Sequence, residues 1–215
     1  MNTVDAIRFL SGIGMAVPLP EERDQMAVVS RLIPISASQF PVIPFPPNDS
    51  LEAQGELKYL MKLQKDKSRD LDFAYKVDKD VAAPFIDYAE VNGLEVRPGY
   101  LDALVHEAVP LLLTLKFQYG RPRPGRLAFM YGLDFKPYDT KTADTPAYPS
   151  GHAFQAYLLA YVLGTKYPAH ASRLERIAER VGQSRMDFGL HFPSDVEAAK
   201  VFAFQAAQAV ASGVV

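Results

Sequence analysis

The chain has 215 residues, of which 48% are hydrophobic and 22% charged, values typical of a globular protein with one sizeable core. Its formal net charge of −2 argues against a general nucleic-acid binder, although it leaves room for a local basic pocket. With no cysteine, the chain has no disulfide framework, thiol nucleophile or cysteine metal site. No stretch approaches the roughly 18 consecutive apolar residues of a membrane span, so we expect no integral membrane segment.

The N-terminal segment contains a short apolar patch over residues 9–17. Asp5 precedes the patch, and serine and glycine residues interrupt it, so it makes a poor signal peptide. The proline-rich stretch FPVIPFPPNDS, residues 40–50, is typical of an extended connector. We therefore predict one domain over residues 46–215, with residues 1–45 packed on it or preceding it.

Beyond the connector, the spacing of apolar residues is mostly helical. Asp49, with Glu52 three residues later, predicts a helix start. Another helix is predicted over residues 81–92, and Gly93 should end it.

The next predicted helix begins near Pro98 and ends near Gly120. Pro110 should kink this helix or split it, because proline lacks the N–H that continues the helical hydrogen bonds. Residues 121–148 are rich in proline and glycine, which is typical of a long loop.

Helical spacing returns over residues 154–162 and 174–181. The last predicted helix, about residues 195–211, is apolar on nearly every side, which is typical of a helix in the middle of a bundle. No run of residues alternates convincingly like a strand. The predicted fold class is therefore all-α, a single-domain helical bundle with long connecting loops.

The first stretch that indicates chemistry is KFQYGRPRP, residues 116–124. Lys116 supplies a compact charge and Arg123 a fork that fits phosphate oxygens, with Arg121 between them. Prolines stiffen the loop at residues 121–124, the arginine loop, and lower the entropy cost of presenting a guanidinium. Taken alone, a lysine at the end of a helix more often matches the helix dipole or aids solubility.

The second stretch is PSGH, residues 149–152, the turn before a helix. The Ser150 hydroxyl can cap this helix, and on this stretch alone that role is as common as a functional one. The N–H groups and the dipole at a helix N-terminus also bind anions. Gly151 lets a ligand oxygen approach the backbone closely, and His152 titrates near neutrality.

The third stretch is SRMDFGLHFPSD, residues 184–195, which contains Arg185, His191 and Asp195. Pro193 is favoured at the first helical position, so His191 should project from the loop before the last helix. The Asp195 carboxylate can then accept a hydrogen bond from one imidazole nitrogen and leave the other as a nucleophile. In isolation, Asp195 could serve only the helix dipole.

Together, the three stretches supply two histidines, three cations, a serine and a helix N-terminus, a set that suits a tetrahedral anion. Cations and N–H donors would hold the oxygens, one histidine would attack, and the other would protonate the leaving group. The sequence therefore predicts phosphoryl transfer from a small phosphorylated substrate.

The pattern K-x6-R-P, P-S-G-H and S-R-x5-H-x3-D resembles the three-part signature of the type 2 phosphatidic acid phosphatase and vanadium haloperoxidase superfamily. All three parts are present in order, over residues 116–195. From about residue 46 onward, the chain is also similar to soluble bacterial class A nonspecific acid phosphatases, above all in GQSRMDFGLHFPSDVEAAK. The first 45 residues match no family that we can place.

The resemblance implies a role for each matching residue. His191 would attack phosphorus and become a phosphohistidine, Asp195 would orient it, and His152 would be the general acid and later the base that activates water. Members of this superfamily are helical, and such enzymes need no metal and no cofactor, with vanadate as an inhibitor. The phosphate-binding residues would be Lys116, Arg123, Ser150, Gly151 and Arg185.

The chain departs from the family in two respects. Most lipid phosphatases of the superfamily span membranes, and this chain has no stretch that could. Soluble acid phosphatases are usually exported, whereas this N-terminus is a poor signal peptide, so we favour a soluble cytoplasmic protein over a periplasmic or exported one. The aromatic-rich composition would suit a homodimer without requiring it.

Other functions stay open as alternatives. A vanadium-dependent haloperoxidase would use the same pocket with vanadate as its cofactor on His191, but such enzymes are generally longer chains. A non-catalytic phosphate-binding protein would retain both histidines and Asp195 without chemistry. A metal hydrolase is disfavoured because His106 and Glu107 lack the partner of an H-E-x-x-H motif.

Several neighbouring residues are assigned ordinary roles. His106 and His170 are expected to be structural or surface histidines. We expect Tyr148, Asp187 and Phe188 to pack within loops, which we favour over a role in lining the pocket.

Overall fold

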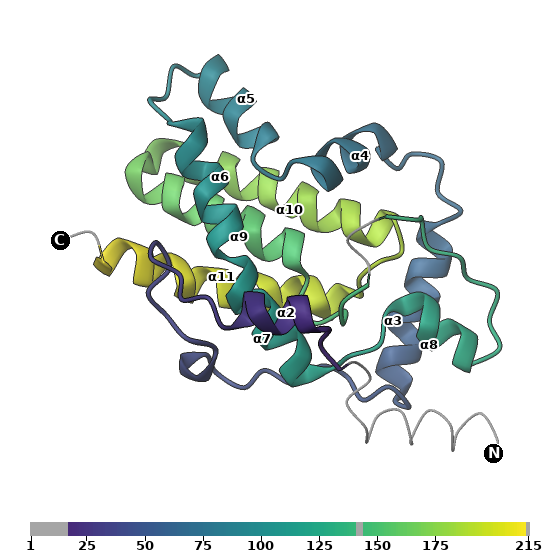
Figure 1. Cartoon of the computed structure of the whole chain (residues 1–215). Helices are drawn as coiled ribbons and strands as arrows, with labels where there is room; N and C mark the ends of the chain where they lie inside the picture. Colours follow the sequence, from purple (N-terminus) through teal and green to yellow (C-terminus); the bar gives the residue numbers. More distant parts are fainter. Residues whose placement is uncertain (1–16, 141–143, 214–215) are drawn as a thin grey trace.

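The computed structural model describes residues 17–140 and 144–213. Within these ranges, all regular secondary structure is α-helix or 3₁₀ helix, and no strand is present (Figure 1). The prediction of an all-α fold is therefore confirmed. In chain order, the elements are α2 Pro20–Met26, η1 Ala37–Gln39, α3 Leu51–Leu63, α4 Leu71–Lys79, α5 Ala83–Val91, α6 Pro98–Glu107, α7 Val109–Tyr119, α8 Pro124–Met130, α9 Gly151–Lys166, η2 Pro168–His170, α10 Ala171–Asp187 and α11 Pro193–Gly213.

Helix α9 is the centre of the bundle, and its most extensive contacts are with α10 and α11 (Figure 1). Leu158 and Leu159 on α9 are fully buried. Helix α10 also meets the start of α11 at one close point, where a Cβ added to Gly182 would lie only 2.7 Å from a Val196 methyl. The central position predicted for the last helix is wrong, since α11 leaves Phe204 about half exposed on its outer side.

Proline and glycine set the helix ends largely as predicted. Pro110 splits the predicted long helix into α6 and α7, and it occupies the first turn of α7, where its missing N–H costs nothing. Gly120 ends α7 in the left-handed conformation, with a φ of 63°. Gly93 has the same φ just after α5.

Two local predictions were wrong. The residue that caps α3 is Ser50, whose hydroxyl accepts from the Ala53 N–H at 3.1 Å, so the helix starts one residue later than Asp49 suggested. The stretch predicted as a loop after Gly120 contains the short helix α8. This helix forms because it buries Leu127 in a small apolar cluster with residues of α3.

The N-terminal segment is attached to the domain through Glu107 at the end of α6. One carboxylate oxygen accepts from the Ser30 hydroxyl at 2.8 Å and from the N–H groups of Arg31 and Leu32 at 2.5 and 2.7 Å. The apolar patch predicted over residues 9–17 lies outside the described residues except for Val17, which is exposed. None of the described helices combines the length and the apolar character that a membrane crossing requires.

Candidate active site

The residues of the three sequence stretches meet where four helix ends converge. Lys116 lies in the last turn of α7, Arg185 in the last turn of α10, and Asp195 in the first turn of α11. The start of α9, at Ser150 and Gly151, lies beside them, and the Ser150 N–H donates to the Asp195 carbonyl at 3.0 Å. The bundle thus joins stretches that are up to 79 residues apart along the chain, from 116 to 195.

His191 stands in the loop before α11, as predicted from Pro193, and it is 2% exposed. Its Nε2 lies 2.8 Å from a guanidinium nitrogen of Arg123, and its Nδ1 lies 3.4 Å from Oδ2 of Asp195. Because Arg123 can only donate, Nε2 presents its lone pair and the ring proton belongs on Nδ1, facing the carboxylate. This tautomer leaves the Nε2 lone pair facing the Arg123 guanidinium.

The electrostatic surroundings of His191 favour its neutral form. Burial lowers its pKa well below the ordinary value, and the charges of Arg123 and Lys116 lower it further. Burial raises the pKa of Asp195, while the Arg121 guanidinium and the Phe192 N–H oppose that rise by binding the carboxylate. A neutral imidazole beside an ion-paired carboxylate is the state that nucleophilic attack requires.

His152 occupies the first turn of α9 and is the more accessible histidine, with its side chain 14% exposed. Its Nε2 lies 3.9 Å from a carboxylate oxygen of Asp78 on α4. Burial lowers the pKa of His152 well below the ordinary value, the nearby Arg185 lowers it further, and a hydrogen bond to the Asp78 backbone opposes both. A phosphate dianion bound here would favour the imidazolium again.

Three cations surround the two histidines. Lys116 is buried and donates to the Pro146 carbonyl at 2.7 Å, and burial lowers its pKa well below the ordinary value. Arg123 also donates to the carbonyls of Thr145 and Leu190, which fixes its fork beside His191. Arg185 is 1% exposed and forms an ion pair with Asp78 at 2.9 Å. The cations that the sequence predicted to bind phosphate therefore lie together around the two histidines.

Ser150 at the start of α9 does not have the capping role that was one of its two predicted roles. It is the N-cap residue, but its side chain makes no capping hydrogen bond. The hydroxyl is buried and has no hydrogen-bond partner among the described residues. At Gly151, an added Cβ would lie 3.7 Å from Cε of Lys116, so the lysine stem crosses the helix start. A buried hydroxyl beside a lysine and open N–H groups suits an anionic ligand.

Three residues outside the predicted set contact this site: Glu56, Asp78 and Arg121. The sequence had singled out neither carboxylate, and it had given Arg121 no role of its own. Asp78 forms an ion pair with Arg185. Arg121 forms ion pairs with both Asp195 and Glu56. Arg121 carried a usable signal, because it lies within the arginine loop. The carboxylates on α3 and α4 carried none, since they look like the solvent-facing charges of ordinary amphipathic helices.

The residues that were assigned ordinary roles have structural contacts. Tyr148 is fully buried and its hydroxyl donates to the Ile43 carbonyl at 2.6 Å. Phe188 stacks on Tyr138, with ring centroids 5.1 Å apart. His170 pairs with the Tyr88 hydroxyl at the start of α10.

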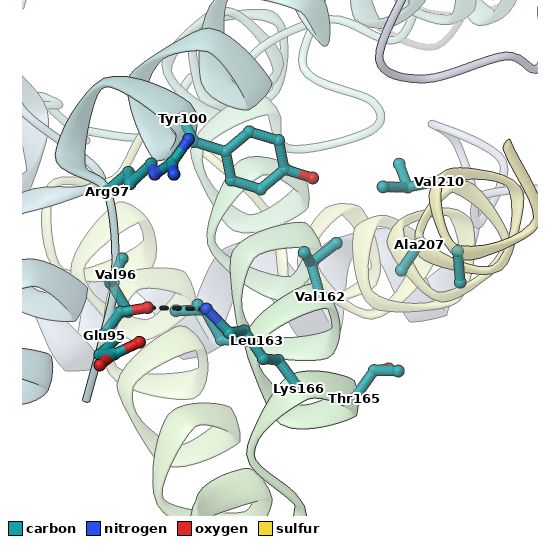
Figure 2. A pocket seen from close by; sticks show the side chains of 11 residues that line it. Glu95, Val96, Arg97, Tyr100, Val162, Leu163, Thr165, Lys166, Ala207 and Val210 are labelled. Carbon is teal, nitrogen blue, oxygen red and sulfur yellow. Dashed lines mark hydrogen bonds between the residues drawn. The ribbon is translucent and has the colours of Figure 1, made fainter. Parts of the chain in front are cut away.

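A cavity of about 730 Å³ lies elsewhere, among the start of α6 and the distal halves of α9 and α11 (Figure 2). Val162 and Val210 line its interior, and the Lys166 amine donates to the Glu95 carbonyl at its rim. The histidine site lies at the opposite ends of α9 and α11, roughly 15–20 Å away along the helices. This cavity is therefore separate from the candidate active site.

The PAP2 superfamily pattern matches residues 100–214, more than half of the chain. The chain belongs to the PAP2 superfamily. The match includes every site residue predicted from the sequence, from Lys116 to Asp195, whereas Glu56 and Asp78 precede it.

Relatives of this PAP2 chain are named non-specific acid phosphatases. The one from Salmonella typhimurium is 41% identical over 88 residues, which cover 40% of this chain and 34% of that protein. The one from Providencia stuartii is 32% identical over 90 residues, which cover 42% of this chain and 36% of that protein. The chain thus matches about a third of the length of these curated relatives.

Among solved structures, the PAP2 chain is similar to a bacterial vanadium-dependent iodoperoxidase. The TM-score is 0.57 at 15% sequence identity, over 88% of this chain and 54% of that one. At this identity the likeness concerns the fold alone, and it agrees with the haloperoxidase-like helical architecture expected from the sequence.

Proposed function

We propose that this protein is a metal-independent acid phosphatase that hydrolyses phosphomonoesters through a phosphohistidine at His191. The observation that carries the proposal is the position of His191 Nε2, whose lone pair faces the Arg123 guanidinium 2.8 Å away while Nδ1 faces Asp195. If these cations bind a phosphate group, the Nε2 lone pair would face its phosphorus, which supports a role for His191 as the nucleophile. The names of the relatives support the same activity.

The substrate phosphate would occupy the space between the cations and the start of α9. Lys116, Arg123 and Arg185 would bind its oxygens, so that Arg123 exchanges its contact with Nε2 for a phosphate oxygen. The Ser150 hydroxyl and the Gly151 N–H would complete the set of donors. These groups stabilise the charge that spreads over the equatorial oxygens during transfer.

In the first step, His191 Nε2 would form a bond to phosphorus while the bond from phosphorus to the leaving oxygen breaks. His152, as imidazolium, would give its proton to that oxygen, and the alcohol departs. Asp195 would hold the proton on Nδ1 and stabilise the positive charge that the ring acquires. In the second step, neutral His152 would take a proton from water, whose oxygen displaces His191 and releases inorganic phosphate.

The proposal is tested by hydrolysis of para-nitrophenyl phosphate across pH, with EDTA present, for the wild type and His191→Ala. We expect hydrolysis by the wild type that peaks on the acid side, inhibition by vanadate, and loss of activity in the variant. Activity that EDTA abolishes and zinc or magnesium restores would overturn the metal-independent mechanism. Absence of hydrolysis, with bromide oxidation by peroxide after loading with vanadate, would favour the haloperoxidase alternative.

A further inference from the structure

Arg121 is a fully buried cation that forms ion pairs with Asp195 and Glu56. One guanidinium nitrogen donates to Asp195 Oδ1 at 2.5 Å and to the Ser194 hydroxyl at 2.7 Å. The other terminal nitrogen donates to Glu56 Oε2 at 2.7 Å. The guanidinium carbon also lies 4.0 Å from the centroid of the Phe192 ring. These contacts direct its charge to protein carboxylates.

Glu56 reaches this cluster from α3, a helix that lies outside the region matched by the superfamily pattern. Both of its oxygens are used: Oε2 accepts from Arg121, and Oε1 accepts from the Ser194 N–H at 2.7 Å. The carboxylate therefore binds both the side chain that holds Asp195 and the first turn of the helix that carries Asp195. Its side chain is 11% exposed, so water screens these contacts little.

The contacts continue without a gap to the nucleophile. Oδ1 of Asp195 accepts from Arg121. Oδ2 accepts from the Phe192 N–H at 2.8 Å and faces His191 Nδ1. The plane of the Asp195 carboxylate is thereby set from both sides. The order of the chain is Glu56, Arg121, Asp195, His191, with alternating charge up to the imidazole.

We propose that Glu56 is a positioning residue that acts on His191 through Arg121 and Asp195. For its effect on turnover, the proposal rests on the phosphatase function proposed above. Glu56 binds Arg121 so that the guanidinium is shared between two carboxylates, and Asp195 keeps its capacity to accept from the Nδ1 proton of His191. A side chain in a helix outside the superfamily match thus sets the tautomer of the nucleophile.

The charges around His191 show why one more carboxylate matters. The imidazole is faced by Arg123 from the arginine loop, Lys116 from α7, Arg185 from α10, His152 from α9 and Asp195 from α11. Asp195 is the anion of this set. If Glu56 loses its charge, Arg121 interacts more strongly with Asp195 alone. The Asp195 carboxylate then accepts less well from His191, and the preference for a proton on His191 Nδ1 weakens.

The test compares Glu56→Gln with Glu52→Gln, a matched control that removes an exposed carboxylate one turn earlier on α3. Ring nitrogen NMR at pH 7 reports the tautomer of His191, whose signals are assigned by their loss in His191→Gln. We expect the Nδ1–H tautomer in the wild type and in the control, and an increased share of Nε2–H in Glu56→Gln. For phosphomonoester hydrolysis, we expect kcat to fall roughly 10- to 100-fold in Glu56→Gln, with KM within about twofold.

A second variant, Glu56→Asp, keeps the charge and separates positioning from folding. We expect Glu56→Asp to recover part of the kcat lost in Glu56→Gln. If Glu56→Gln is less stable, both variants are compared at a low temperature at which both are folded. If Glu56→Gln lowers the melting temperature but leaves the His191 tautomer and kcat unchanged, Glu56 only anchors α3 and the proposal is wrong. If the wild type hydrolyses no phosphate ester, the proposed function fails, while the NMR comparison still decides whether Glu56 positions His191.

Discussion

Asp195 and His191 face each other at the start of α11, with 3.4 Å between Oδ2 and Nδ1. Their separation by four residues places both at one helix end, and the Phe192 N–H between them holds Oδ2 in place. The carboxylate therefore selects the imidazole tautomer whose Nε2 faces the cations.

Asp195→Asn should lower kcat by roughly 10³- to 10⁴-fold while KM changes little, because an amide no longer favours the Nδ1–H tautomer or the imidazolium. Steady-state hydrolysis of para-nitrophenyl phosphate measures both constants. The double variant with His191→Ala should be no slower than His191→Ala alone, since the two residues act as a unit. A substitution that affected KM alone would argue that Asp195 has only a structural role.

Asp78→Asn should lower kcat roughly tenfold, because Arg185 loses the carboxylate that holds its fork in place. Removing this negative neighbour also disfavours the imidazolium of His152, so the alkaline limb of the pH profile should move to lower pH. Asp72→Asn is the matched control, since it removes an exposed carboxylate from the same helix, α4. Equal profiles for the two variants would contradict the role given to Asp78.

The pH dependence of the wild type should differ between the free and the bound enzyme. Burial and Arg185 lower the pKa of His152 below its ordinary value of 6.5. As pH rises, His152 loses the proton that it must donate, so the decline of kcat/KM should already begin at a pH lower than 6.5. Bound phosphate raises the pKa again, and the alkaline limb of kcat should therefore lie at higher pH than that of kcat/KM. A flat profile from about pH 4 to 9, with chemistry limiting, would contradict the two-histidine mechanism.

Ser150→Ala should separate ligand binding from helix capping. The hydroxyl makes no capping hydrogen bond, so the free energy of unfolding should stay the same or rise by about 1 kcal/mol. Vanadate inhibition should weaken roughly 10- to 100-fold, because a hydrogen bond to a charged ligand is lost. The contrasting control is Ser50→Ala, whose hydroxyl does cap α3, and which should lose about 1 kcal/mol of stability with unchanged inhibition.

Glu107→Gln should destabilise the protein by about 1 kcal/mol at pH 7, because the carboxylate accepts from three groups of the N-terminal segment. The N–H of Leu32 is the largest cause that lowers the pKa of Glu107 from 4.5. A lowered folded-state pKa means that this stability is complete above the unfolded value and is lost as pH falls through the folded value. Thermal unfolding should therefore separate the wild type from the variant at pH 7 and bring them together in acid, with Asp102→Asn on the same helix as control.

The sequence determined those features that depend on near neighbours along the chain. Pro110 split a helix and Gly120 ended one, because a missing N–H and a left-handed φ act on the adjacent turn. Pro193 and Asp195 are close to His191 along the chain, and this spacing placed the histidine and its carboxylate partner at one helix end. Local rules were weaker where burial decides the outcome, as for α8, which forms because Leu127 packs on α3.

Only the tertiary structure decided which charged groups serve the site. Glu56 and Asp78 lie on amphipathic helices whose other carboxylates face solvent, and their contacts to Arg121 and Arg185 join segments far apart in the chain. The Ser150 hydroxyl was equally suited to cap its helix or to bind a ligand, and its surroundings left it without a capping bond. Such choices depend on packing between distant helices, because burial removes competing water and makes each pairing between charges selective.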